Sequence, residues 1–306
     1  MPDAALKPDR QSESLQLPGG RTLSLFQRPL VMGVLNITPD SFSDGGLFAE
    51  SAAAVEQARR MIAGGADLLD LGAESTRPGG GVYGDGADTV PAAEELRRLL
   101  PVLEAVRAET AMPISVDTRK GDVAAAALAA GADMVNDISL LSDPALATTV
   151  ASAGCPLIIM HSRGQLRTMQ QRASYEDLLS EVRRELAEAI ERAIGAGVGR
   201  HQILVDPGIG FGKTARQNVV LLGRLEELGV MGLPVVVGAS RKSFIATLAG
   251  DSPPDRRLGG SLAAVAAAAR AGAAIVRVHD VAETVQFLSI LRAVESSGRD
   301  TGGPVS

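Results

Sequence analysis

Residues 206–214 read Asp-Pro-Gly-Ile-Gly-Phe-Gly-Lys-Thr and follow the apolar run Ile-Leu-Val at 203–205. The apolar run predicts a buried strand that ends on the carboxylate of Asp206. Pro207 has no backbone N–H and therefore ends the strand ladder, and the glycines after it let the backbone approach a bound molecule closely. The alternative interpretation is a tight strand-to-helix turn that Asp206 caps. Other strands that also end in polar residues favour a binding site.

Apolar runs of the same kind recur along the chain, and a helical segment follows each of them. Strands are predicted at 31–38, 67–74, 114–118, 134–138, 157–161, 203–206, 235–239 and 275–279. Helices are predicted near 51–64, 91–108, 120–130, 143–153, 175–195, 215–228, 241–249 with 259–271, and 281–294. Eight strand–helix units in roughly 250 residues predict an α/β fold, the (β/α)8 TIM barrel. A doubly wound open sheet is the alternative.

The region before the barrel predicts a β-hairpin. Residues 15–17 and 23–25 alternate apolar and polar side chains on either side of Pro-Gly-Gly at 18–20. We therefore expect a TIM barrel with an N-terminal β-hairpin extension. The expected domains are a tail and hairpin at 1–28, the barrel at 29–295 and a disordered tail at 296–306.

Two connections are longer than turns require, at 39–50 and 77–90. Both follow predicted strands, so both are expected at the carboxyl end of the barrel. Long glycine-rich loops in that position commonly act as lids over a bound substrate.

Composition excludes several classes of protein. A net charge of −6 and the lack of tryptophan argue against a nucleic-acid partner. The single cysteine, Cys155, excludes an intramolecular disulfide and any metal site built from several cysteines. The sequence contains no apolar run long enough for a membrane span, and its start lacks the features of a signal peptide. We expect a soluble cytoplasmic protein with no membrane partner.

Polar residues stand at the predicted strand ends, which meet at one site in a barrel. A first set combines acceptors, an amide and a cation: Asp117, Asn136, Asp206 and Lys242. This mixture matches a flat heterocycle, because a carboxylate can accept two parallel N–H bonds and an amide can both donate and accept. The alternative for Asp117 and Asn136 is capping of the helices that follow them.

A second set has the character of an anion site: Asn36, Ser240, Arg241, Arg277 and His279. Arg277 and His279 are two residues apart on one predicted strand and therefore share a face. A helix predicted to begin near Ser240 would add its N-terminus. The alternative is a salt bridge from Arg277 to Asp280 or another acid.

Other chemistries find little support in the sequence. The three histidines are His161, His201 and His279, and His201 is expected at the opposite end of the barrel, so a three-histidine metal site is not expected. His161 is interpreted as a core residue or a support for the site. No nucleophilic triad or phosphate-binding loop motif is present, and Gly-x-Gly-x-Gly at 208–212 has the wrong spacing for a dinucleotide fingerprint.

Over residues 29–293 the chain resembles the dihydropteroate synthase family. Eight segments carry the resemblance, in order: VMGVLNITPDSFSDGG at 31–46, ESTRPG at 74–79, SVDT at 115–118, VNDI at 135–138, MH at 160–161, DPGIGFGK at 206–213, GASRK at 238–242 and VRVHD at 276–280. Each is weak alone, but eight in order are highly specific.

The resemblance implies condensation of 6-hydroxymethyl-7,8-dihydropterin pyrophosphate with 4-aminobenzoate, by an SN1-like step, to 7,8-dihydropteroate and pyrophosphate. It implies pterin binding by Asp117, Asn136, Met160, Asp206 and Lys242. It implies pyrophosphate binding by Asn36, Ser240, Arg277 and His279, with Mg²⁺ bridging the phosphates and touching Asn36. It implies aminobenzoate binding by Phe42, Thr76, Pro78, Phe211 and Ser243, and catalytic roles for Asp44, Lys242, Arg277 and His279. A homodimer and a sulfonamide target are implied as well.

Two related functions remain as alternatives. Methyltetrahydrofolate methyltransferases share the pterin residues but have no use for a pyrophosphate clamp such as Arg277 and His279. A homologue that binds pterin without turnover would lack pyrophosphate release.

Overall fold

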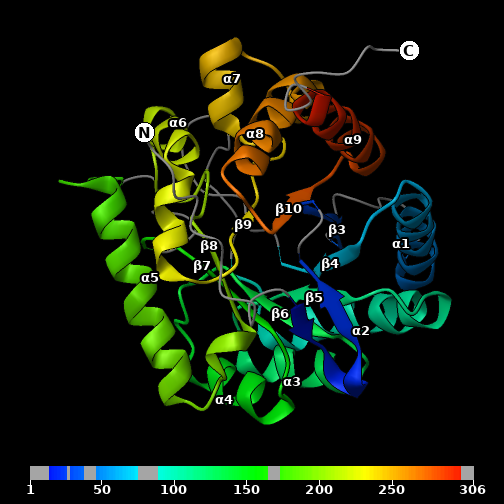
Figure 1. Cartoon of the computed structure of the whole chain (residues 1–306). Helices are drawn as coiled ribbons and strands as arrows, with labels where there is room; N and C mark the ends of the chain where they lie inside the picture. Colours follow the sequence, from blue (N-terminus) through cyan, green and yellow to red (C-terminus); the bar gives the residue numbers. More distant parts are fainter. Residues whose placement is uncertain (1–13, 26–27, 38–45, 75–88, 165–172, 298–306) are drawn as a thin grey trace.

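The computed structural model describes residues 14–25, 28–37, 46–74, 89–164 and 173–297. Its centre is an eight-stranded parallel sheet with the order β8-β7-β6-β5-β4-β3-β10-β9. A parallel bridge between Val205 and Val235 joins the two outer strands of that order, so the sheet curls into a barrel (Figure 1). This confirms the predicted (β/α)8 fold, and the open doubly wound sheet is wrong.

The strands are short and almost fully buried. They are β3 (Leu30–Asn36), β4 (Leu68–Gly72), β5 (Ile114–Asp117), β6 (Met134–Asp137), β7 (Leu157–Met160), β8 (Ile203–Asp206), β9 (Val236–Val237) and β10 (Ile275–Val278). The register places Asp117 beside both Gly72 and Asn136, and Met160 beside Asp206. Residues that end neighbouring strands therefore lie at one level, on a single rim of the barrel.

The helices surround the strands, as Figure 1 shows. They are α1 (Gly46–Ala63), α2 (Ala92–Glu109), α3 (Gly121–Ala129), α4 (Pro144–Ala153), α5 (Leu178–Gly195), α6 (Ala215–Gly223), α7 (Ser243–Ala249), α8 (Leu258–Arg270) and α9 (Val281–Ser297). Local signals fix several ends: Asp143 and Asp177 accept backbone N–H groups at the starts of α4 and α5. Thr214 and Gln217 form a capping box that begins α6.

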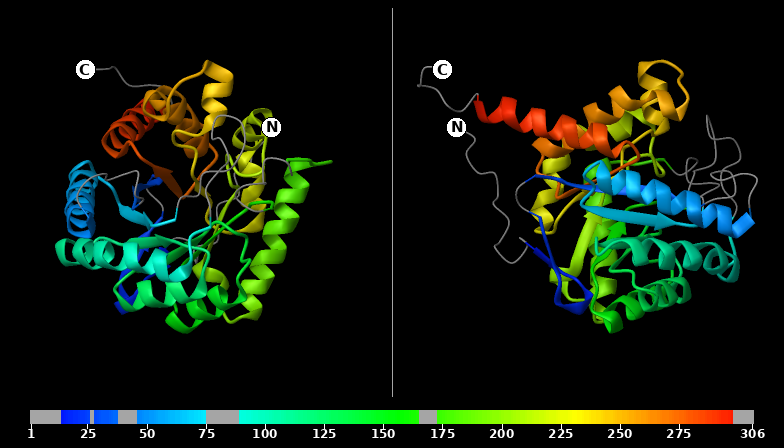
Figure 2. Two further views of the ribbon diagram at one scale, coloured as in Figure 1. Left: turned by 180° about the vertical axis from the view of Figure 1, so that it is seen from behind. Right: turned by 90° about the vertical axis from the view of Figure 1, so that its right-hand side faces the viewer.

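The N-terminal hairpin closes the end of the barrel where the strands begin. It pairs β1 (Ser14–Gln16) with β2 (Thr22–Ser24) around the 3₁₀ turn η2 (Pro18–Gly20). Leu15 is 1% exposed and belongs to an apolar cluster with strand residues such as Met32 and Met134. Arg21 forms an ion pair with Asp133, which begins the turn into β6. Figure 2 shows the hairpin beside this end of the barrel, so the predicted extension is confirmed as a cover of its base.

Several boundaries differ from the prediction, each for a local reason. The helix expected at 215–228 ends at Gly223 and continues as the 3₁₀ segment η7 (Leu225–Met231), because Arg224 leaves helical geometry at φ −126°. The helix expected from residue 241 begins at Ser243, because Arg241 has a φ of +60°. Short 3₁₀ turns also form at η6 (Arg200–Gln202) and η8 (Pro254–Arg256).

The chain ends add two further observations. Helix α9 reaches Ser297, two residues past the barrel limit expected at 295, and residues 298–306 lie outside the described part. Of the loop expected at 39–50, the last five residues already belong to α1, while 38–45 and 75–88 lie outside the described residues. Among the helices that the structure describes, none combines the length and the apolar character that a membrane crossing requires.

Candidate active site

The site is organised by an ion-pair cluster at the carboxyl end of the barrel. Arg277, on β10, donates from Nε to Oδ2 of Asp70 on β4 at 2.6 Å and from Nη2 to Oδ2 of Asp117 on β5 at 2.8 Å. Asn136, on β6, donates from Nδ2 to the same Asp70 oxygen at 3.2 Å. One guanidinium thus connects the residue set predicted for a heterocycle with the set predicted for an anion. The alternative interpretation of Arg277, a salt bridge to Asp280 or another acid, holds in its second form, because its partners are Asp70 and Asp117 and not Asp280.

Two carboxylate oxygens of this cluster have no partner. Oδ1 of Asp117 and Oδ1 of Asp70 are buried and make no hydrogen bond within the described part of the chain. Burial raises the pKa of the Asp117 carboxyl, and the nearby Asp70 raises it further, whereas the Arg277 guanidinium opposes the rise. Buried acceptors normally find donors, so the unpaired oxygen of Asp117, at the end of β5, is a candidate acceptor for a donor from outside the chain.

Asp206, at the end of β8, is the third carboxylate of the site and is 5% exposed. Its Oδ1 accepts the backbone N–H of Gly208 at 2.7 Å. Burial raises the pKa of Asp206 to about 6, while that hydrogen bond and the charges of Lys242 and Arg277 limit the rise. A Cβ at Gly238 would lie 3.7 Å from Oδ2 of Asp206, an ordinary van der Waals distance, so this position does not require glycine. The backbone of the turn therefore holds one oxygen of the Asp206 carboxylate, Oδ1.

An aromatic ring and a cation stand together next to these acids. Nζ of Lys242 lies 4.0 Å from the ring centroid of Phe211, a cation–π contact. Burial lowers the pKa of Lys242 to about 8, and the positive charge of Arg277 lowers it further. Phe211 also packs with Met160 and Ile138 in a small buried cluster. The structure thus brings Met160, Lys242 and Phe211 together beside the carboxylates.

Ser240 and His279 form the second part of the site. Oγ of Ser240 accepts the backbone N–H of His279 at 3.2 Å and lies 3.1 Å from Nδ1 of the same histidine. Burial lowers the pKa of His279 to about 3, and the cations around it lower it further, so the ring is neutral. When the Ser240 hydroxyl donates to Nδ1, the ring proton stays on Nε2. His279 can then donate that hydrogen to an anion.

Arg241 does not join the anion site. It is in the left-handed region at φ +60°, a conformation that costs energy for a residue with a side chain. Its Nε donates to Oδ2 of Asp280 at 3.1 Å, and its backbone N–H donates to Ser261 at 2.9 Å. Tertiary contacts to Asp280 and Ser261 therefore hold the strained backbone of Arg241 in place. Arg241 lies between Ser240 and Lys242, so its conformation sets the path of the chain between these two site residues.

The remaining predicted residues divide into described and undescribed ones. Asn36 ends β3 and is exposed, and Ser243 is the first residue of α7. The sequence predicted that this helix begins near Ser240. In the structure α7 begins at Ser243, so that part of the prediction is wrong. The other predicted positions lie outside the described residues: Phe42, Asp44, Thr76 and Pro78.

Sequence reasoning missed one site residue, Asp70, and left the role of one other, His161, open. Asp70 is fully buried under Arg277, and its only signal was a charged residue inside the apolar run of β4. His161 is fully buried as well, where Nδ1 meets Nζ of Lys213 at 2.9 Å. His161 is thus a support of the site, one of the two interpretations that the sequence allowed.

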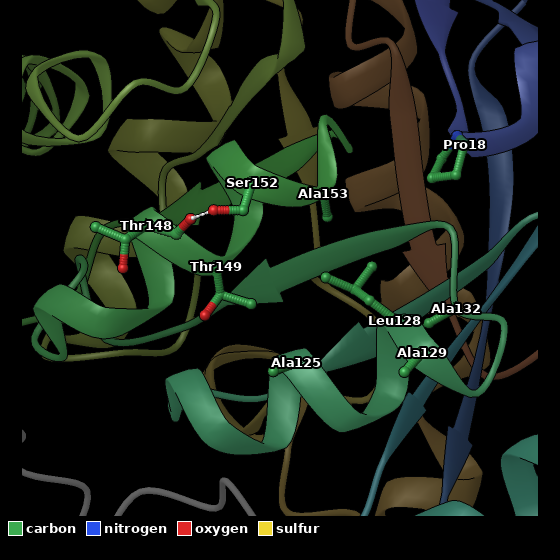
Figure 3. A pocket seen from close by; sticks show the side chains of 9 residues that line it. All are labelled: Pro18, Ala125, Leu128, Ala129, Ala132, Thr148, Thr149, Ser152 and Ala153. Carbon is green, nitrogen blue, oxygen red and sulfur yellow. Dashed lines mark hydrogen bonds between the residues drawn. The ribbon is translucent and has the colours of Figure 1, made fainter.

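A pocket also lies at the base of the barrel, away from the candidate active site. It has a volume of about 550 Å³ and is lined by Pro18 of the hairpin and by residues of α3 and α4, among them Leu128 and Thr149 (Figure 3). Its lining is alanine, leucine, threonine, serine and proline, and contains no titratable group. General acid–base chemistry therefore belongs to the carboxyl end and not to this pocket.

Comparison with known proteins agrees with this geometry. A family described as "Pterin binding enzyme" matches residues 32–279. Dihydropteroate synthase of Synechocystis sp. is 46% identical over 280 residues, 91% of this chain and 94% of that protein. The Escherichia coli K12 enzyme of the same name is 44% identical over 278 residues, 91% of this chain and 95% of that protein.

Solved structures give the same result. Xanthomonas albilineans dihydropteroate synthase with 4-aminobenzoic acid has a TM-score of 0.84 and 46% identity, covering 93% of this chain and 98% of that one. The structure of dihydropteroate synthase from the same organism in complex with 7,8-dihydropteroate has a TM-score of 0.81 and 43% identity, covering 92% of this chain and 99% of that one. The chain therefore belongs to the dihydropteroate synthase family of pterin-binding enzymes.

Proposed function

We propose that the chain condenses 6-hydroxymethyl-7,8-dihydropterin pyrophosphate with 4-aminobenzoate to form 7,8-dihydropteroate and pyrophosphate. The observation that carries the proposal is the open, buried Oδ1 of Asp117 beside the cations of the same rim. Such an oxygen requires an N–H donor from a ligand, and the pterin ring carries several. The relatives bound to 4-aminobenzoic acid and to 7,8-dihydropteroate support the choice of substrates.

The pterin ring would bind among the two carboxylates and the amide. Asp117 and Asp206 accept N–H groups from the amino-pyrimidine edge, and Asn136 stands beside them with its amide already oriented by Asp70. Lys242 supplies a donor for a ring acceptor, and Met160 an apolar surface against the ring plane. The buried position excludes water, which strengthens each of these hydrogen bonds.

The pyrophosphate would bind at the neighbouring part of the rim. His279 donates from Nε2, Arg277 adds positive charge, and Ser240 keeps the imidazole in the donating tautomer. No group of three or more His, Cys, Asp or Glu side chains that could hold a metal ion occurs among the described residues. The donor set fits Mg²⁺ that arrives with the substrate, because Mg²⁺ commonly keeps waters and binds substrate phosphates with few protein ligands. Asn36 would be its protein ligand, and the ion would neutralise phosphate charge.

The reaction breaks the bond between the pterin methylene carbon and the pyrophosphate oxygen. The electron pair leaves with the pyrophosphate, whose charge His279 and Arg277 stabilise, and the electron-rich dihydropterin stabilises the cation. In this SN1-like order the aromatic amine then forms the new C–N bond and loses a proton. The carboxylates of Asp117 and Asp206 stabilise positive charge on the ring. Asp44, which lies outside the described residues, remains a further proposed stabiliser.

The aminobenzoate would bind against Phe211, near the start of α7. The ring of Phe211 supplies an aromatic wall, and Ser243 offers a hydroxyl and a backbone N–H at the N-terminus of α7. Phe42, Thr76 and Pro78 stay predicted members of this pocket. The relative from Yersinia pestis was solved with a sulfonamide drug, so we also propose sulfonamide binding at the aminobenzoate position.

We further propose that the chain works as a homodimer. Ile290 and Val294 on α9 are 61% and 63% exposed, and Leu248 on α7 is 57% exposed. Helices α7 and α9 both pack against α8, and exposed apolar residues that form a patch are common at subunit interfaces. A cytoplasmic location stays a prediction from the sequence.

A pyrophosphate-release assay tests the proposed function. Release should require both substrates and a divalent ion, and it should saturate with 4-aminobenzoate. Release with pterin pyrophosphate alone at the same rate would indicate hydrolysis, and no release under any condition would leave a pterin-binding protein without this activity. Methyl transfer from a methylated folate would favour the methyltransferase alternative, in which the arrangement of Ser240 and His279 has no use.

A further inference from the structure

Lys213 is 2% exposed and lies in the stretch that follows β8, yet the proposed reaction does not use it. Its ammonium group donates to three acceptors: Nδ1 of His161 at 2.9 Å, the carbonyl of Gly208 at 3.1 Å and the carbonyl of Phe211 at 3.0 Å. Burial lowers the pKa of Lys213 to about 7, and the charge of Asp206 opposes the fall. In its ammonium form the lysine has three hydrogens, and the three acceptors engage all of them. Lys213 therefore acts on the groups that it binds and not directly on a substrate.

Two of those acceptors, Gly208 and Phe211, belong to a turn that is rich in glycine. Gly208, Gly210 and Gly212 all have positive φ values, of 69°, 86° and 58°. Glycine reaches such conformations without strain but loses much entropy when it is fixed there. The turn closes through the hydrogen bond from the N–H of Phe211 to the carbonyl of Gly208, at 3.0 Å. Lys213 donates to the carbonyl of Gly208 and to the carbonyl of Phe211, and so holds both ends of the turn.

His161 connects Lys213 to the rigid frame. Because Lys213 donates to Nδ1, the ring proton of His161 is on Nε2, from which it donates to Oε2 of Glu185 on α5 at 3.0 Å. Glu185 in turn accepts from Nε of Arg163 at 3.0 Å. Burial lowers the pKa of His161 to about 4, and the charge of Lys213 lowers it further, so the ring stays neutral. Lys213, His161 and Glu185 therefore connect the turn to helix α5.

Both substrate subsites border this turn. At one end, the N–H of Gly208 donates to the carboxylate of Asp206, and at the other end the turn carries the ring of Phe211. We infer that Lys213, anchored through His161 to Glu185, is a positioning residue that holds Phe211 in place as the wall for the second substrate. The inference rests on the proposed function for the identity of that substrate. The backbone of Asp206 belongs to β8, whereas Phe211 belongs to the turn itself, so the pterin side depends less on Lys213 even though the Asp206 carboxylate accepts from Gly208.

The test compares Lys213→Met with Arg216→Met, which removes a cation from an exposed position on α6. Lys213→Met should raise the KM for 4-aminobenzoate about tenfold or more and change the Kd for pterin less than about threefold. Hydrogen exchange at the Phe211 amide should become at least tenfold faster, and Arg216→Met should match the wild type. A purely structural role would lower the active fraction and kcat without this difference between substrates. Equal KM and exchange in the two variants would overturn the inference.

A second pair of variants serves if Lys213→Met does not fold. His161→Asn places a carbonyl oxygen near the position of Nδ1 and keeps an acceptor for Lys213, whereas His161→Leu removes it. The Asn variant should keep the wild-type KM for 4-aminobenzoate within about threefold, and the Leu variant should raise it about tenfold. The same KM in both would contradict the inference. A wild type that releases no pyrophosphate would refute the proposed function instead, and hydrogen exchange, which needs no substrate, would still decide the role of Lys213.

Discussion

Arg277 on β10 and Asp117 on β5 form an ion pair of 2.8 Å across the mouth of the barrel, and Asp70 binds the other side of the same guanidinium. The pterin site and the pyrophosphate site are therefore not independent. Removal of the pyrophosphate clamp also releases two buried carboxylates of the pterin side.

The first prediction concerns this pair. Arg277→Ala should lower the free energy of unfolding by about 3–5 kcal/mol at pH 7.5, because Asp70 and Asp117 stay buried without a compensating charge. Arg277 lowers the pKa of the Asp117 carboxyl, so its loss should raise that pKa, and protonation at lower pH should relieve the cost of the buried charge. The loss in free energy of unfolding relative to the wild type, measured by urea denaturation, should therefore be smaller at pH 5.5 than at pH 7.5. A deficit that grows as the pH falls would contradict this account.

Arg241→Ala is the matched control. Arg241 pairs with Asp280, and both side chains are partly exposed, at 32% and 17%. Removal of Arg241 should lower the free energy of unfolding less than removal of Arg277 does, and this loss should change little between the two pH values.

Binding gives a further comparison for Arg277→Ala. Pterin pyrophosphate should lose more affinity than free pterin, since only the former carries the anion.

The second prediction concerns Asp206. Asp206→Asn should weaken pterin binding at least about tenfold, or ~1.4 kcal/mol, because a charge-assisted hydrogen bond is lost. The pKa of about 6 in the free protein means that the carboxyl protonates below neutral pH. Since pterin N–H groups require the ionised form, the wild-type Kd should rise as the pH falls from 7 to 5. Calorimetry should show a weaker pH dependence for Asp206→Asn, and an equal one would exclude Asp206 from the pterin site.

The third prediction concerns Gly208. A Cβ at this position would lie 1.9 Å from the carbonyl oxygen of His161, and φ is +69°. Gly208→Ala should therefore abolish activity or prevent stable folding. Gly232 has a similar φ of +65° but nothing within 4 Å of an added Cβ, so Gly232→Ala should cost only the conformational penalty, about 1–2 kcal/mol. Thermal unfolding compares the two, and equal losses would mean that the close contact is not important.

The fourth prediction concerns the hairpin at the base. Leu15→Ala should lower the free energy of unfolding by about 2–5 kcal/mol, because it leaves a cavity in a closed core. Substrate binding by the folded protein should not change, since the site is at the other end of the barrel. Val219, which is 45% exposed on α6, provides a control, and Val219→Ala should have little effect. Equal stability of the Leu15 and Val219 variants would show that the hairpin does not seal the base.

The fifth prediction concerns Ser240. Its hydroxyl holds the tautomer of His279 that donates from Nε2. Ser240→Ala should weaken pterin pyrophosphate binding about fivefold, the effect of one hydrogen bond of roughly 1 kcal/mol. Binding of free pterin should stay as in the wild type. A similar loss for both ligands would assign Ser240 to the fold and not to the anion site.

The sequence was sufficient for the barrel, because eight apolar runs alternate with helical segments along the chain and several helices carry local start signals. Asp143, Asp177 and Thr214 are local caps that fix helix starts without tertiary information. The start of α7 was missed for the opposite reason. The left-handed backbone of Arg241 depends on its ion pair with Asp280, which comes from another part of the chain.

The sequence predicted most residues of the candidate site but not the hydrogen bonds and ion pairs between them. Asp117, Asn136, Asp206 and His279 were recognisable as strand ends. The partner of Arg277 was not, because Asp70 is inside a strand and pairs with a residue from a distant part of the sequence. The role of Lys213 was equally hidden, since its acceptor on His161 comes near it only when β7 and β8 are side by side.

The central claim is that pterin and aminobenzoate join as pyrophosphate leaves. The most direct measurement is the ratio of 7,8-dihydropteroate, identified by mass spectrometry, to pyrophosphate released in the same reaction. We expect a ratio of one with the wild type and no product when either substrate is omitted. Pyrophosphate without dihydropteroate, or no turnover with both substrates and Mg²⁺ present, would contradict the claim.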